Sequence, residues 1–394
     1  MRRAAAAAVV ALLAGAAVAS AAVPAPPTVP GWPKTLSPGP VLQGPQGGMV
    51  LVSSRYAEAG ASGFDARAFR RDGRRLWGVS QESGCGNCDG GPQSVALQPD
   101  GSYGPIGYEG DYFWSVDQQG RLTTSCAGVV FADGSCVIGG SSAHTTPPVA
   151  RPAVFGSPPG TRTPSWTVGI PGWFWYGEFE VPPMTVRDGR GVVYVAFANP
   201  RAPGQPPGPG IPGLLVAIDP VAQRVLWTVE GPSQALTGLG SGVLVTAGDG
   251  ISAYRADGTV AWRRGVPTGQ GVHPSQVVYD APRDRIYLGR LAGTRRAQPG
   301  VTALVAATGA QVWRTRPADR ARLLSVGAGG RVYVAVDRPG HRAVRGLRAA
   351  GGATAWERRT RLVVHGAREL VNGTVAVSAG RSAGPGVLTL LDPR

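Results

Sequence analysis

The fold of this chain is decided by residues 303–313, ALVAATGAQVW, and by the segments that repeat their outline. An apolar stretch leads to a turn of small or acidic residues, and a second stretch ends in tryptophan. Alternating stretches joined by such a turn predict a β-hairpin. Two weaker copies, residues 114–125 and 153–166, have Thr124 and Trp166 near the last position. Four further copies end at tryptophans 77, 227, 262 and 356: AFRRDGRRLW, AIDPVAQRVLW, AYRADGTVAW and GLRAAGGATAW.

A second hairpin precedes each of these segments. It joins an apolar stretch to one rich in valine and tyrosine, as in residues 184–197, MTVRDGRGVVYVAF, and 323–336, LLSVGAGGRVYVAV. Each unit therefore has four strands, A to D, with the tryptophan on strand D. The 60 glycines and 36 prolines argue against a helical protein. Repeated four-stranded units predict an all-β fold, the β-propeller, in which each unit is one blade.

The repeat resembles that of the PQQ-like, or quinoprotein-like, propeller family, whose signature is AxDxxTGxxxW. Residues 303–313 match it except for Val305 at the aspartate position, and residues 217–227 keep the alanine, Asp219 and the tryptophan but lack the Thr-Gly. The resemblance extends over the chain as blades. It implies a propeller fold and leaves the cofactor open.

The number of blades depends on how the two ends of the chain are paired. Strand D is present seven times, at Trp77, Thr124, Trp166, Trp227, Trp262, Trp313 and Trp356. An eighth set of strands, in residues 369–380 and 386–394, has no strand D after it. Residues 29–36, VPGWPKTL with Trp32, form a single strand with no set before it. Pairing the two closes the ring and covers an open sheet edge. We therefore expect eight blades, with seven as the alternative.

The first 22 residues have the layout of a secretory signal. Arg2 and Arg3 precede an Ala/Val/Leu run, and small residues follow at 19–21. The alternative is an uncleaved membrane anchor. We expect residues 23–394 to form a single propeller domain without a transmembrane segment, a monomer that is secreted or associated with the cell envelope.

The chain is basic, with a formal net charge of +15 that comes almost entirely from arginine. Codon usage explains scattered arginines, whereas a functional interpretation is attraction to anionic surface polymers or phospholipid. Arginine- and lysine-rich tracts are absent from the sequence, which argues against nucleic acid as a partner.

Four cysteines indicate two disulfides in an exported chain. We favour the pairs Cys85–Cys88 and Cys126–Cys136 because each pair is close in sequence, although three pairings are possible. The CGNC segment also has the form of a redox or metal-binding pair.

The connections between strands differ in length according to type. The A–B and C–D turns are short, as in PDG and ADG, whereas the B–C and D–A connections contain the long insertions. In an antiparallel blade these two sets lie on opposite faces of the ring. Long loops gathered on one face of a rigid scaffold predict a binding surface there. The histidines fall in the same connections but are too scattered to indicate a metal site: His144, His273, His341 and His365.

Two aromatic and acidic segments are candidate ligand sites on that face. The first contains Trp173, Trp175 and Tyr176, followed by Glu178 and Glu180. It could stack on sugar rings or a peptide, or it could be a hydrophobic plug over the central channel.

The second segment runs from Tyr108 to Trp114 and contains Glu109 and Asp111. Its carboxylates could bind a cation or pair with arginines.

Two classes of function remain open. The first is a non-catalytic scaffold that binds a protein or an anionic cell-wall glycan, without a cofactor. The alternative is a propeller enzyme that acts on sugars, such as a dehydrogenase using pyrroloquinoline quinone and Ca²⁺, as the resemblance implies. This sequence offers no HExxH motif and no residue set that we can match to the calcium ligands or the base of those enzymes. We therefore expect a scaffold and leave the metal undetermined.

Overall fold

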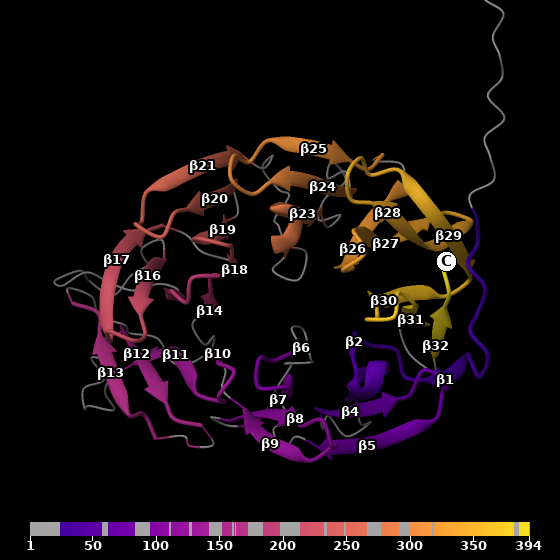
Figure 1. Ribbon diagram of the computed structural model, residues 1–394, viewed down its shortest axis with the longest axis horizontal. Helices are drawn as coiled ribbons and strands as arrows, with labels where there is room; N and C mark the ends of the chain where they lie inside the picture. Colours follow the sequence, from indigo (N-terminus) through magenta and orange to yellow (C-terminus); the bar gives the residue numbers. More distant parts are fainter. Residues whose placement is uncertain are drawn as a thin grey trace, which may run out of the picture.

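The computed structural model is a closed ring of eight four-stranded antiparallel sheets around a common axis (Figure 1). It describes residues 24–56, 62–82, 95–109, 112–125, 128–141, 152–159, 161, 163–171, 184–197, 213–231, 235–247, 250–265, 277–290, 300–316, 319–381 and 386–393. The prediction of an eight-bladed β-propeller is confirmed, and the seven-bladed alternative is wrong.

Blades one to four follow one another along the chain, each with its first strand innermost. Blade one contains β2 (Val41–Gln43), β3 (Met49–Tyr56), β4 (Ser62–Phe69) and β5 (Arg75–Glu82). Blade two contains β6 (Ala96–Leu97), β7 (Tyr103–Glu109), β8 (Tyr112–Val116) and β9 (Leu122–Ser125). Blade three contains β10 (Val129–Val130), β11 (Cys136–Ser141), β12 (Pro152–Ser157) and β13 (Trp166–Gly169). Blade four contains β14 (Met184–Arg187), β15 (Val193–Phe197), β16 (Leu214–Asp219) and β17 (Arg224–Glu230).

Blades five to seven repeat this order, and two short 3-10 turns, η1 (Pro45–Gly47) and η3 (Ala281–Arg283), lie in A–B turns of the ring. Blade five contains β18 (Ala235–Gly238), β19 (Val243–Ala247), β20 (Gly250–Tyr254) and β21 (Val260–Gly265). Blade six contains β22 (Val277–Asp280), β23 (Arg285–Arg290), β24 (Gly300–Val305) and β25 (Gln311–Arg314). Blade seven contains β26 (Ala321–Val326), β27 (Arg331–Arg338), β28 (His341–Arg348) and β29 (Thr354–Thr360).

Blade eight takes its strands from both ends of the chain. β30 (Val363–Glu369), β31 (Val375–Gly380) and β32 (Gly386–Leu391) come from the C-terminus, and β1 (Lys34–Leu36) is the outer strand. Lys34 pairs with Leu388 and Leu36 with Gly386. Pairing of the two ends is therefore confirmed, but the ladder is shorter than the expected strand of residues 29–36. Pro30 and Pro33 have no N–H to donate, so the continuous ladder begins after Pro33.

The core of the ring lies between neighbouring blades. The middle strands are buried on both faces, as the wholly buried β15 and β31 show, because each sheet packs against a sheet on either side. Fully buried tyrosines lie near the start of four second strands: Tyr103, Tyr194, Tyr287 and Tyr333. Burial raises the pKa of Tyr103 and of Tyr287 to about 12, so both remain neutral hydroxyls.

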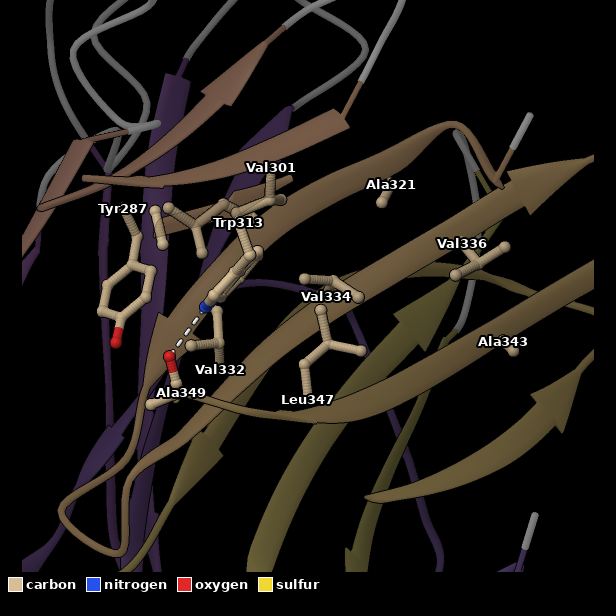
Figure 2. Close-up of a cluster of buried hydrophobic side chains, with 12 residues drawn as sticks. Tyr287, Val301, Trp313, Ala321, Val332, Val334, Val336, Ala343, Leu347 and Ala349 are labelled. Atoms are coloured by element: carbon tan, nitrogen blue, oxygen red, sulfur yellow. Dashed lines mark hydrogen bonds between the residues drawn. The ribbon is translucent and has the colours of Figure 1, made fainter. Parts of the chain in front are cut away.

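The repeated tryptophan links each blade to the next. Figure 2 shows Trp313 on β25 donating its Nε1–H to the Ala349 carbonyl, 2.7 Å away in the C–D turn of blade seven. A Cβ on the turn glycine, Gly352, would lie 2.8 Å from the indole ring, so the ring needs a glycine beneath it. Equivalent bonds to the next blade join Trp77 to Gln118, Trp227 to Ala256, Trp262 to Ala306 and Trp32 to Arg71, at 2.7–3.0 Å.

Trp166 and Trp356 do not make this bond to any described residue. Their rings instead cover the glycines opposite them on their own third strands, Gly156 and Gly346. Blade eight has no C–D turn because its fourth strand comes from the other end of the chain, so the Nε1 of Trp356 is buried without a partner. The four tryptophans of β5, β17, β21 and β25 face an alanine instead: Ala68, Ala217, Ala253 and Ala303.

The N-terminal segment closes the ring across three blades. Glu357 of blade seven donates its backbone N–H to the Pro24 carbonyl at 3.0 Å, and Thr28 forms a bridge with Leu391 of blade eight. Trp32 then reaches blade one, where it is buried and packs edge-on against Phe69 with ring centroids 5.8 Å apart. In Figure 1 this indigo segment lies along the outside of β29 and β32.

The hydrogen bond of the repeated tryptophan can be isolated by comparing two equivalent positions. Trp313→Phe removes ring volume and the bond to Ala349, whereas Trp356→Phe removes similar volume and an unpaired donor. We expect Trp313→Phe to lower the free energy of unfolding by about 1–2 kcal/mol more than Trp356→Phe does, because a buried carbonyl loses its donor. Urea unfolding of both variants measures the difference. Equal losses would show that the bond contributes nothing.

The ring closure predicts a global effect of a change near the N-terminus. Trp32→Ala should destabilise the protein by about 3–5 kcal/mol, as loss of a large buried aromatic does, and deletion of residues 28–36 should cost more. Thr35→Ala, at an exposed position of β1, is the control and should change stability by less than about 0.5 kcal/mol. Calorimetry should show one transition at lower temperature. A wild-type melting temperature for Trp32→Ala would contradict closure by this residue.

Candidate functional site

The two faces of the ring differ in the hydrogen bonds that connect neighbouring blades. One, which we call the turn face, contains the A–B and C–D turns, and all five tryptophan bonds end there. The other, which we call the long-loop face, contains the B–C and D–A connections. None of the described tryptophan hydrogen bonds involves the long-loop face. Loops on that face can therefore differ in length without breaking these bonds between blades.

The turn face is further fixed by a local hydrogen-bond motif. Asp257 accepts the Thr259 backbone N–H at 2.9 Å and its hydroxyl at 2.7 Å, and these bonds lower the pKa of Asp257. The same bonds join Asp133 to Ser135 and Asp100 to Ser102. An Asp-Gly turn with a hydroxyl residue after it is thus a structural unit of this chain and not a ligand site.

Most of the predicted site residues lie outside the described residues. This holds for the first aromatic segment, Trp173, Trp175, Tyr176, Glu178 and Glu180, and for Asp111. Tyr108 lies on β7, opposite Phe113 of β8. The grouping of these residues into a ligand site stays a prediction.

The cysteines are described only in part. Cys136 begins β11, is buried and is not a free thiol. Cys85, Cys88 and Cys126 lie outside the described residues, so the two predicted pairs stay predictions.

The histidines are placed differently from the expectation that all four lie in loops. His341 is the first residue of β28, next to the B–C turn, as expected for the long-loop face. His365 instead lies within β30, because the short connection after β29 lets the next inner strand begin at Val363. His144 and His273 lie outside the described residues.

A basic pocket of about 560 Å³ opens on the long-loop face at blade seven. Three connections form it: the segment before β26, the Pro339–Gly340 turn between β27 and β28, and the segment after β29. It is lined by four arginines, one histidine and one acid: Arg320, Arg338, Arg342, Arg361, His341 and Asp337.

Below the pocket, two carboxylates hold a network of half-buried charges. Glu357 accepts a hydrogen bond from Arg345 and lies 3.1 Å from His341 Nε2. Burial works to raise the pKa of Glu357, but the Arg345 hydrogen bond and the nearby cationic charges hold it below its usual range. Asp319 receives Arg345 at 2.9 Å and Arg338 at 3.6 Å. Both carboxylates are thus already used by residues at the base of the pocket.

The pocket therefore has cationic groups to spare. Arg342 pairs with Asp337 at 2.9 Å, but neither Arg320 nor Arg361 makes an ion pair with any described residue. Both side chains are exposed, and Arg320 has a left-handed backbone with φ 45°, which is uncommon for a residue other than glycine. Unpaired guanidinium groups around one cavity make this a candidate site for an anion.

Further basic groups lie on the inner strands of the last two blades. Arg322 of β26 donates to the Val364 carbonyl of β30, and burial lowers its pKa. Burial and the charge of Arg322 lower the pKa of the neighbouring His365, which is therefore neutral at neutral pH. Burial also lowers the pKa of Arg368.

The described residues do not fit the calcium ion that the resemblance implies. Among them, no group of three or more histidine, cysteine, aspartate or glutamate side chains could hold a metal ion. The charged cluster that they do contain is an arginine network, which attracts anions. We therefore derive no chemical step through a cofactor.

Fold and pocket together define a closed eight-bladed propeller with one variable face. Residues 281–394 match a family model described as "Outer membrane protein assembly factor BamB". The resemblance stated from the sequence is confirmed over these residues, which contain the last blades of the propeller. No curated protein matches the chain.

Solved structures share the architecture at low identity. Quinohemoprotein alcohol dehydrogenase from Comamonas testosteroni aligns with a TM-score of 0.55 and 14% identity, over 92% of this chain and 76% of that one. BamB from Moraxella catarrhalis aligns with a TM-score of 0.38 and 12% identity, over 89% of this chain and 81% of that one. At this identity the dehydrogenase shows the fold alone. In the part of the chain that the structure describes, no helix has the length and hydropathy needed to span a bilayer.

The pocket is hard to recognise from the sequence. Its arginines are spread over residues 320–361 and form no tract. One signal was available: the B–C connection of blade seven is only Pro339–Gly340, whereas that of blade four occupies the residues between Phe197 and Leu214. Where a connection is this short, no loop covers the charged ends of the strands, and a cavity can open there.

The ion-pair network predicts a pH-dependent effect of Glu357. Its pKa is lower in the folded chain, so it stabilises the fold above its unfolded pKa, about 4.3, and this stabilisation is lost as pH falls through the folded pKa. Glu357→Gln should lower the free energy of unfolding by about 1–3 kcal/mol at pH 7 and by much less near pH 3. Urea titrations at both pH values measure this. A loss that does not depend on pH would contradict the assignment.

Proposed function

We propose that this protein is an exported, non-catalytic binding scaffold of the cell envelope that holds an anionic glycan or a protein on its long-loop face. One observation carries the proposal: the described tryptophan bonds between blades all end on the turn face. The opposite face is free to diversify, and rigid scaffolds with variable loops on one face are typical of binding proteins.

The charge of that face favours an anionic partner. The described part of the long-loop face contains the pocket with four arginines, in a chain whose formal net charge is +15. A cationic concave surface raises the local concentration of anionic polymers and speeds their association. The family description, an outer membrane protein assembly factor, supports a role at the envelope and keeps a protein partner as the second possibility. Export rests on the signal-like residues 1–22.

The proposal can be tested by retention on purified cell walls. Protein is mixed with insoluble walls at low ionic strength, and the bound fraction is measured after sedimentation. The variant Arg320→Gln/Arg361→Gln removes two charges from the long-loop face, and Arg71→Gln/Arg348→Gln removes two exposed charges from the turn face. We expect the first variant to reduce retention severalfold, whereas the second should behave as the wild type.

The predicted aromatic segment is tested in the same assay. Trp173→Ala/Trp175→Ala should weaken retention if these side chains stack on sugar rings. Wild-type retention in that variant would remove them from the proposed site. Equal losses from both arginine variants would indicate nonspecific charge attraction and would contradict a dedicated face.

A further inference from the structure

The basic pocket on blade seven suggests a particular ligand chemistry. We propose that it binds a phosphate group attached to a polyol or sugar unit. The inference rests on the proposed function in that it uses the long-loop face, but it concerns one defined cavity and a small ligand. Four observations support it, namely charge balance, the choice of basic residue, cavity lining and loop length.

The charge balance of the pocket favours an external anion. Its lining has four guanidinium groups against one carboxylate, Asp337, which already pairs with Arg342. The carboxylates beneath, Asp319 and Glu357, are bound to Arg345 and its neighbours. Arg320 and Arg361 are thus left without an ion pair among the described residues. A dianionic phosphate matches this surplus better than a single carboxylate does.

The type of base also favours phosphate. Guanidinium groups present several N–H donors in a fixed plane and bind phosphate oxygens in pairs, which an ammonium group cannot do. The pocket contains arginine and no lysine, in keeping with a chain whose only lysine is Lys34.

The volume and lining indicate what the phosphate is attached to. At about 560 Å³ the cavity is much larger than a phosphate ion. The rest of its lining is Pro339, Gly340 and Thr360, and no phenylalanine, tyrosine or tryptophan is among the lining residues. A nucleobase would find no phenylalanine, tyrosine or tryptophan to stack on, and an acyl chain would find no large apolar side chain. Hydroxyl groups of a polyol or sugar would find donors and acceptors.

The short B–C loop of blade seven exposes charged strand ends to the cavity. The two-residue connection Pro339–Gly340 turns tightly, with Gly340 at φ 72°, and leaves the ends of β27 and β28 uncovered. Arg338, His341 and Arg342, at these strand ends, therefore border the cavity directly. The segment before β26 supplies Arg320 and the segment after β29 supplies Arg361, so separate parts of blade seven converge on one point.

Calorimetric titration of the full chain with glycerol 3-phosphate at low ionic strength tests the proposal. We expect saturable binding by the wild type and none of glycerol at the same concentrations. Arg320→Gln and Arg361→Gln should each weaken binding about tenfold or more, because each removes a charged hydrogen-bond donor. Arg348→Gln, an exposed arginine on the turn face, should bind as the wild type does. Thermal melts verify that all variants are folded.

Other probes distinguish the sources of phosphate and the outcomes that overturn the proposal. Inorganic phosphate binding as tightly as glycerol 3-phosphate would remove the polyol part. Binding of anionic phospholipid vesicles that depends on Arg320 and Arg361, without binding of glycerol 3-phosphate, would assign the pocket to a membrane surface and overturn the proposal. Absence of binding by the wild type, or an equal loss in Arg348→Gln, would also overturn it.

The two proposals fail separately. If the pocket variants lose glycerol 3-phosphate but keep their retention on cell walls, the pocket assignment stands and wall binding through this pocket is wrong. If retention is lost while glycerol 3-phosphate never binds, the face is correct and the ligand chemistry is wrong.

Discussion

The structure depends on one interaction, the hydrogen bond from an indole Nε1–H on the outer strand of one blade to a turn carbonyl of the next. A ring of separate sheets has no continuous ladder to hold it together, and apolar packing between blades does not fix their register. The indole holds neighbouring blades together, because its large ring is buried against a turn glycine of the next blade. It also fixes their register, because its hydrogen bond to that turn is directional. Trp32 makes the same bond across the junction between the ends of the chain, so the closure uses the same chemistry as the blades.

That interaction also divides the molecule into two faces. The turns that receive the indoles must keep their length, their glycine and their free carbonyl, and Asp-Gly turns such as that at Asp257 hold this geometry with side-chain hydrogen bonds. The opposite connections are not subject to this requirement. Insertions therefore accumulate there, and the arginine-lined pocket is found at a blade whose B–C connection has only two residues. Rigidity on one face and variation on the other have a common physical origin.

Exceptions in the repeat follow from the same rule. Trp356 has no turn to reach, because blade eight is completed by a strand from the other end of the chain, and its Nε1 remains buried and unpaired. Its ring folds back over Gly346, at a position where four other blades have alanine. The glycine was visible in the segment GLRAAGGATAW before the structure was known. The segment does not reveal that the Trp356 Nε1–H lacks an acceptor, because that acceptor would belong to the next blade.

By itself, the sequence determined the propeller, the count of eight and the pairing of the two ends, because periodic tryptophans and short turns are local signals that each unit repeats. It also indicated which face would contain the long loops, since this follows from strand order alone. Only the tertiary structure decided where charge would gather. Arg320 and Arg361 are far apart in the chain and are brought to one cavity by the return of the chain around blade seven. Whether these arginines form ion pairs depends on the nearby carboxylates of Asp319 and Glu357, which pair with Arg345 in the folded chain. Ion pairing is a property of distances in space, which composition and spacing along the chain do not specify.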